Sequence, residues 1–106
     1  MMKLDPKLEE QIVNLFSANS HVTKVVLFGS RARGDADERS DIDLAIYALG
    51  IDEREKAKLT CLVDDLNTLL PVDIIWIDEA SQPLKEQIAR DGMAIYELNQ
   101  SETKHE

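Results

Sequence analysis

The sequence predicts a small α/β or α+β domain in which helices cover a modest sheet. Segments with helical periodicity alternate along the chain with short apolar runs rich in β-branched residues. The 106 residues are 43% hydrophobic and 31% charged, which suits one compact core and excludes a disordered chain. We therefore expect residues 1–106 to form a single domain, with residues 97–106 as a polar tail.

The first part of the chain predicts a helix followed by a buried strand. We expect the helix over residues 5–19, because a cap residue and a proline open it and apolar residues then recur on one face. The run TKVVLFGS is typical of a buried strand that ends at the turn Gly29-Ser30. A short helix over residues 30–36 is also expected, although Gly34 weakens that prediction.

The second part predicts three more strands and two more helices. The stretch DIDLAIY, residues 41–47, alternates polar and apolar positions, as a strand with one buried face does. Leucine-rich helical spacing then runs from about residue 52 until Pro71, and residues 72–77 form a second apolar run. Residues 81–92 predict a helix opened by Ser and Pro and ended by Gly, and residues 93–98 predict a small edge strand.

Charge and composition exclude several classes of function. The formal net charge of −9 argues against an extended nucleic-acid-binding face, so we expect no direct nucleic-acid binding and favour a basic protein partner. The N-terminus lacks a secretory signal and no apolar run approaches the ~20 residues that a membrane span needs, so a cytoplasmic protein without membrane contact is expected. Cys61 is expected to be structural, and neither His21 nor His105 has partners at zinc-ligand spacing.

Two aspartates in one apolar strand are the first functional signal. Alternation places Asp41 and Asp43 on the same strand face, where they repel each other unless a cation compensates. One interpretation is a solvated strand end, with Ser40 and Asp41 as a turn or cap pair. The other is a magnesium-nucleotide site, because the turn Gly29-Ser30 can hold phosphate oxygens and Mg²⁺ bridges carboxylates to phosphate.

A third carboxylate, Asp73, lies near the start of the later apolar run and could complete a two-metal site. The segments Gly29-Ser30-Arg31-Ala32-Arg33-Gly34 and Ser40-Asp41-Ile42-Asp43-Leu44 together resemble the signature of the DNA polymerase β-like nucleotidyltransferase superfamily. Within it the chain resembles the minimal nucleotidyltransferases (MNT) that act as antitoxins of HEPN-domain ribonuclease toxins. The resemblance covers residues 25–96 and implies a small mixed sheet flanked by helices, in the polymerase β-like nucleotidyltransferase fold.

The resemblance also implies roles for individual residues. Gly29 and Ser30 would bind the triphosphate, and Asp41 and Asp43 would hold two Mg²⁺ ions and the nucleotide. Asp73 would hold the catalytic metal and help to activate the acceptor hydroxyl, with Asp78 and Glu79 as the nearest alternatives. Among the arginines, Arg39 is the favoured phosphate partner, whereas Arg31 and Arg33 are equally consistent with phosphate contacts and with solvated loop positions.

Three functions follow from the resemblance. The first is a protein adenylyltransferase that moves AMP from ATP to a hydroxyl, favoured as a tyrosine, of a cognate HEPN-type RNase toxin and thereby neutralises it in a hetero-oligomer. The second is a non-catalytic antitoxin that sequesters the toxin by binding. The third is a nucleotidyltransferase acting on a small molecule such as an aminoglycoside, which is disfavoured because no extra domain is expected to form that pocket.

Overall fold

The computed structural model describes residues 4–34, 41–66 and 68–98. The described residues form nine elements, four of them α-helices and four of them strands of a single sheet. In chain order they are α1 (Pro6–Ser17), β1 (Val22–Phe28), α2 (Ser30–Arg33), β2 (Ile42–Ala48), α3 (Glu53–Asp64), β3 (Val72–Trp76), the 3₁₀ turn η1 (Ile77–Glu79), α4 (Gln82–Asp91) and β4 (Met93–Glu97).

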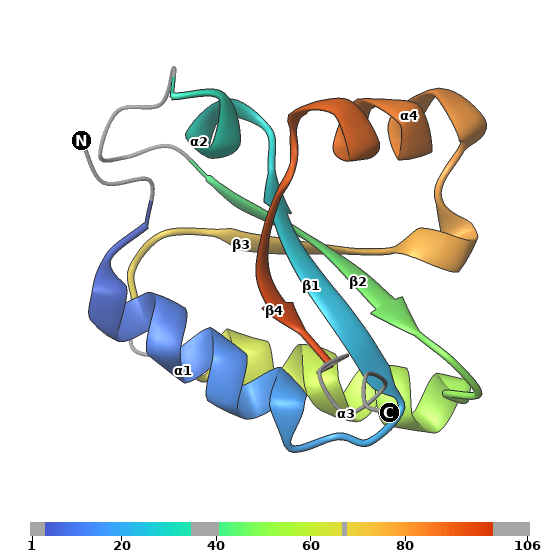
Figure 1. Ribbon diagram of the computed structural model, residues 1–106. Coiled ribbons are helices and arrows are strands. Elements are labelled where there is room, and N and C mark those ends of the chain that lie inside the picture. The colour runs from blue at the N-terminus through green and yellow to red at the C-terminus, as the bar shows by residue number, and fades with distance from the viewer. Residues whose placement is uncertain (1–3, 35–40, 67, 99–106) are drawn as a thin grey trace, which may run out of the picture.

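The sheet is mixed, with strand order β3-β2-β1-β4. Strand β1 pairs antiparallel with both β2 and β4, whereas β2 and β3 are parallel and are joined through α3. Helices α1 and α3 lie on one side of the sheet and α4 on the other, and the short α2 lies at the end of β1 (Figure 1). The predicted α/β architecture with a small mixed sheet is therefore confirmed.

Three helices begin where the sequence predicts because a side chain caps each one. Asp5 accepts a hydrogen bond from Lys7 N at the start of α1, and Ser81 accepts one from Leu84 N at the start of α4. Asp52 does the same for α3 by accepting from Glu55 N at 2.8 Å. Each helix start is thus set by local residues, which the sequence alone reveals.

Helix α3 is shorter than its leucine spacing predicts. It ends at Asp64, and the backbone N–H of Leu66 turns to the carbonyl of Val63 instead of continuing the helical ladder. Acidic residues at the end of a helix are unfavourable because the helix dipole is negative there. Leu62 is 44% exposed and Leu69 is fully exposed, so these two members of the pattern do not contribute to the core.

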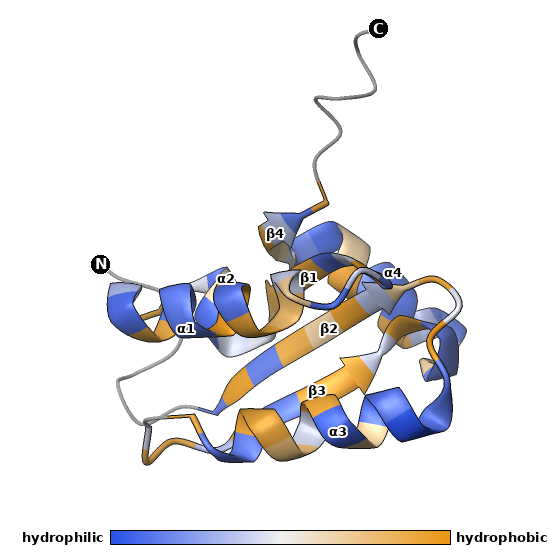
Figure 2. Cartoon of the chain, turned by 90° about the horizontal axis from the view of Figure 1, so that it is seen from below, coloured by the Kyte–Doolittle hydropathy of each residue, from blue (hydrophilic) through white to orange (hydrophobic). Residues whose placement is uncertain are grey.

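The core is divided by the sheet into two layers. The larger layer lies under α1 and α3 and includes Ile12, Phe16 and alternate residues of β1 and β2. The smaller layer lies under α4 and contains Val26, Phe28, Ala45 and Ile88. Strands β2 and β3 are apolar along most of their length and hydrophilic near their beginnings (Figure 2). Those beginnings carry the aspartates that the sequence singles out.

One prediction about an individual residue needs correction. Cys61 is exposed on α3 and takes no part in the core, because it lies on the solvent side of the helix from Leu59 and Val63. His21 lies on the surface, where its Nδ1 is 3.0 Å from the carbonyl oxygen of Leu49 and its Nε2 is 3.5 Å from Glu55 Oε1. None of the helices in the described part of the chain is both long enough and apolar enough to cross a bilayer.

Candidate active site

The parallel pairing of β2 with β3 brings two of the predicted carboxylates together. Asp43 and Asp73 are direct partners in the register, one residue after the pair Ile42 and Val72. Side chains of directly paired residues in a sheet point to the same face. The backbone N–H of Ile42 also donates to the carbonyl of Pro71 at 2.9 Å, which fixes the two strand beginnings side by side.

Alternation along β2 assigns the face on which these aspartates lie. Ile42, Leu44 and Ile46 are fully buried in the layer beneath α1 and α3. Asp43 therefore points to the opposite face together with Ala45, which packs in the layer under α4. This face is covered by α4 further along the strands and is open at their beginnings, where Asp41 and Asp73 are exposed.

The three carboxylates lie close enough together to interact electrostatically. Burial raises the pKa of the Asp43 carboxyl above its ordinary value, and the negative charges of Asp73 and then of Asp41 raise it further. The alternative interpretation places both Asp41 and Asp43 in full solvent. It is wrong for Asp43, which is half-buried, and it holds for Asp41, which is exposed. A site that collects negative charge in this way favours a bound cation.

The turn Gly29-Ser30 lies against the same carboxylates. Gly29 follows β1 directly, and the neighbouring strand residue Phe28 is paired with Asp43. Gly29 has φ +80°, and a Cβ atom added to it would come within 2.5 Å of Asp43 Oδ2. Only glycine permits this close approach of the turn to the carboxylate. Ser30 then opens α2, a helix of four residues that ends at Arg33 and is followed by Gly34.

The arginines differ in their surroundings. Arg31 is buried with 8% exposure, so the solvated interpretation is wrong for it, whereas Arg33 is exposed at the end of α2. Arg39, the favoured phosphate partner, lies outside the described residues, as does Ser40. The sequence alone could not separate Arg31 from Arg33, because two arginines separated by one residue in the same short segment have the same local signal.

Asp78 and Glu79, the alternatives to Asp73, are held elsewhere. Both lie in η1, beyond the end of β3, and both contact the ammonium group of Lys56. Asp73 is at the beginning of the strand, three residues before Trp76. The register therefore favours Asp73 over either alternative as the third carboxylate beside Asp43.

The residues present fit magnesium bound together with a nucleotide. Within the part of the chain that the structure describes, no three His, Cys, Asp or Glu side chains form a ready-made metal cluster. Mg²⁺ rarely needs such a cage, since it keeps several waters and is held by one or two carboxylates together with substrate phosphates. The carboxylate oxygens of Asp43 and Asp73 would supply such ligands, and the neighbouring turn Gly29-Ser30 could bind the phosphates.

Comparison with known proteins defines the class of this protein. The sequence profile described as "Polymerase beta, Nucleotidyltransferase" matches residues 10–101. The chain therefore belongs to the polymerase β nucleotidyltransferase family and is an enzyme of the nucleotidyltransferase class. No curated protein sequence matches it significantly.

Solved structures narrow the resemblance to minimal nucleotidyltransferases. One similar chain, 28% identical with a TM-score of 0.69 over 89% of this chain and 76% of that one, belongs to a crystal structure of a toxin–antitoxin with AMP-PNP. Another, described as a minimal nucleotidyltransferase, is 29% identical with a TM-score of 0.68 over 88% of this chain and 95% of that one.

A third similar chain belongs to a complex of a tri-AMPylated HEPN toxin with an MNT antitoxin from Shewanella oneidensis. It is 23% identical, with a TM-score of 0.62 over 96% of this chain and 78% of that one, and this likeness shows the fold. The predicted resemblance to the minimal nucleotidyltransferases and their fold is confirmed.

Proposed function

We propose that this protein is an antitoxin that transfers AMP from ATP to a hydroxyl, favoured as a tyrosine, of a cognate HEPN-type RNase toxin. The observation that carries the proposal is the pairing of Asp43 with Asp73 beside the turn at Gly29, within a nucleotidyltransferase family member. The similar toxin–antitoxin structure with AMP-PNP supports ATP as the substrate and a toxin as the partner. We further propose that residues 1–106 act as one domain in the cytoplasm.

In this proposal Asp41, Asp43 and Asp73 hold Mg²⁺, and Gly29 and Ser30 bind the triphosphate. When bound by these residues, Mg²⁺ would lower the pKa of the attacking hydroxyl and neutralise charge on the leaving phosphate. The acceptor oxygen forms a bond to the α-phosphorus, the bond from that phosphorus to the bridging oxygen breaks, and pyrophosphate leaves. The hydroxyl proton would pass to the carboxylate of Asp73, which is exposed, and from there to solvent.

The individual residues of the site would act mainly by positioning. The close approach of Gly29 to Asp43 would place phosphate oxygens and carboxylates within reach of the same ions. The fixed register of β2 and β3 would hold the two carboxylates at one spacing, so little reorganisation is needed at the moment of transfer.

The deciding experiment is intact mass spectrometry of the partner. The HEPN-type protein is incubated with Mg²⁺, ATP and this chain, and the chain is then removed. We expect the partner to gain one or more AMP units with release of pyrophosphate and to remain without RNase activity after the removal. The Asp43→Asn variant should leave the mass unchanged.

Other outcomes select other functions. A partner of unchanged mass that is inhibited only while the chain is bound would refute transfer and establish sequestration. AMP appearing on an aminoglycoside, with none on the partner, would establish the small-molecule reaction.

A further inference from the structure

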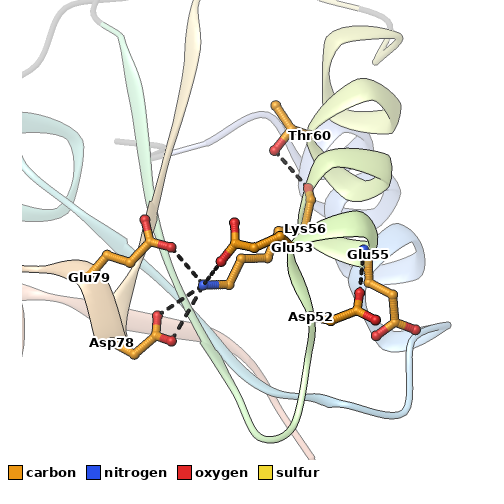
Figure 3. A network of polar contacts seen from close by, with 7 residues as sticks. All are labelled: Asp52, Glu53, Glu55, Lys56, Thr60, Asp78 and Glu79. Atoms are coloured by element: carbon orange, nitrogen blue, oxygen red, sulfur yellow. Dashed lines mark hydrogen bonds and ion pairs between the residues drawn. The ribbon is translucent and has the colours of Figure 1, made fainter.

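Lys56 is a charged side chain that α3 buries against the end of β3. The residue is only 6% exposed. Its Nζ donates to Glu79 Oε2 at 2.7 Å and lies 3.4 Å from both carboxylate oxygens of Asp78. Glu53, one turn earlier on α3, adds an ion pair at 3.6 Å. Figure 3 shows the carboxylates of η1 and of α3 converging on this one nitrogen.

The same ammonium group lies over the ring of Trp76, 5.4 Å from its centroid. Trp76 is the buried residue of β3, since Val72, Ile74 and Ile75 are partly exposed and Asp73 is exposed. Strand β3 is at the edge of the sheet and pairs with β2. The strand that carries Asp73 is therefore held at its beginning by pairing with β2 and at its other end by the packing of Trp76 under Lys56.

We propose that Lys56 is a positioning residue for the nucleotide site: by holding Trp76 and η1 against α3 it keeps β3, and with it Asp73, in register with Asp43. The inference rests on the proposed function. Lys56 does not touch the site itself, because Asp73 precedes Trp76 by three residues, about 10 Å along a strand. Its effect is transmitted by the backbone of β3.

The charges around Lys56 favour this role over simple stabilisation. The hydrogen bond that Lys56 donates to Glu79 raises the pKa of the Lys56 ammonium above its ordinary value, so the group stays charged at neutral pH. Its acidic partners are 54–86% exposed, and ion pairs with exposed groups contribute little to stability because solvent screens them. What the contacts do provide is a fixed place for η1 and for the end of β3.

The test compares Lys56→Met with Lys58→Met, a matched change of an exposed lysine on the same helix. The measurement is the Mg²⁺ concentration needed for half-maximal binding of AMP-PNP. We expect Lys56→Met to raise this Mg²⁺ concentration about tenfold and Lys58→Met to leave it unchanged. Lys56→Arg should bring it most of the way back to the wild-type value. In an Asp73→Asn background Lys56→Met should have no further effect, because the two residues act through one strand.

A second variant keeps the test decisive if Lys56→Met unfolds at the assay temperature. Glu79→Gln removes the charge at the shortest contact from an exposed position and should shift the Mg²⁺ dependence in the same direction by a smaller factor. If the double variant shows the product of the two single effects of Lys56→Met and Asp73→Asn on the Mg²⁺ concentration, the inference is wrong. It is also wrong if Lys56→Met lowers the Tm and leaves the Mg²⁺ dependence unchanged. A wild-type protein without magnesium-dependent binding would instead refute the proposed function, and this inference with it.

Discussion

Replacing Asp43 by Asn should stabilise the metal-free protein while abolishing transfer. Asp43 lies directly opposite Asp73 and is near Asp41, and like charges that face each other across strands cost roughly 0.2–1 kcal/mol per pair. Removing the central charge should therefore raise the free energy of unfolding by about 0.5–1 kcal/mol. In a domain of this size 1 kcal/mol corresponds to a Tm change of about 4–8 °C, so we expect a rise of about 2–8 °C.

The pH dependence of this gain has a definite sign. The folded-state pKa of Asp43 is raised above its ordinary value of 3.8, so its ionisation weakens the folded state. The contribution is favourable below pH 3.8 and is lost as the pH rises through the folded-state pKa. The difference in Tm between Asp43→Asn and wild type should consequently be absent at low pH and fully developed at neutral pH.

Thermal melting in EDTA at several pH values, with Glu10→Ala as an exposed control, measures this effect. A Tm that falls on substitution at neutral pH would refute the reasoning, because it would mean that the carboxylate makes a stabilising contact in the fold. Retained AMP transfer by Asp43→Asn would show that the metal-binding carboxylates lie elsewhere.

Three further outcomes are expected. Gly29→Ala and Gly50→Ala should each lower the free energy of unfolding by about 1–2 kcal/mol in urea titrations, because both glycines have positive φ. Only Gly29→Ala should also weaken AMP-PNP binding, because the added Cβ would collide with Asp43. The free energy of unfolding of the wild type should fall as the pH rises above 10.5 through the raised pKa of Lys56. If Lys56→Met loses as much stability as the wild type over this pH range, the loss does not come from Lys56. Asp5→Ala should cost about 1 kcal/mol by removing the cap of α1, whereas a change below 0.3 kcal/mol in chemical denaturation would show that the cap is redundant.

The parts of the fold that depend on neighbouring residues were predictable from the sequence. Asp5 and Ser81 cap helices within three residues of themselves, and the alternation in residues 41–47 is a property of one strand. The end of α3 was not predictable from its apolar spacing, because Leu66 and Leu69 continue the same spacing through a turn. Periodicity shows which residues could share a helix face, and tertiary packing decides where the helix stops.

The site was predictable in its composition and only partly in its geometry. The paired aspartates Asp41 and Asp43 and the turn at Gly29 are visible in the sequence, whereas the register of Asp73 depends on strand pairing across 30 residues. The burial of Lys56 could not be foreseen, because its partners Asp78 and Glu79 lie 22 and 23 residues away. A lysine in an amphipathic helix gives no local sign that its charge is enclosed.

The parallel pairing of β2 and β3 also has a consequence for folding. Parallel strands cannot be joined by a tight hairpin, and here the connection runs through α3, so this pairing closes a long loop. Contacts of that kind form slowly compared with local ones. The pair Asp43–Asp73 therefore exists only once the sheet has acquired its edge strand, and partly folded chains would lack it. Slowed hydrogen exchange in β3 on addition of Mg²⁺ and AMP-PNP would reveal this coupling between ligand and edge strand.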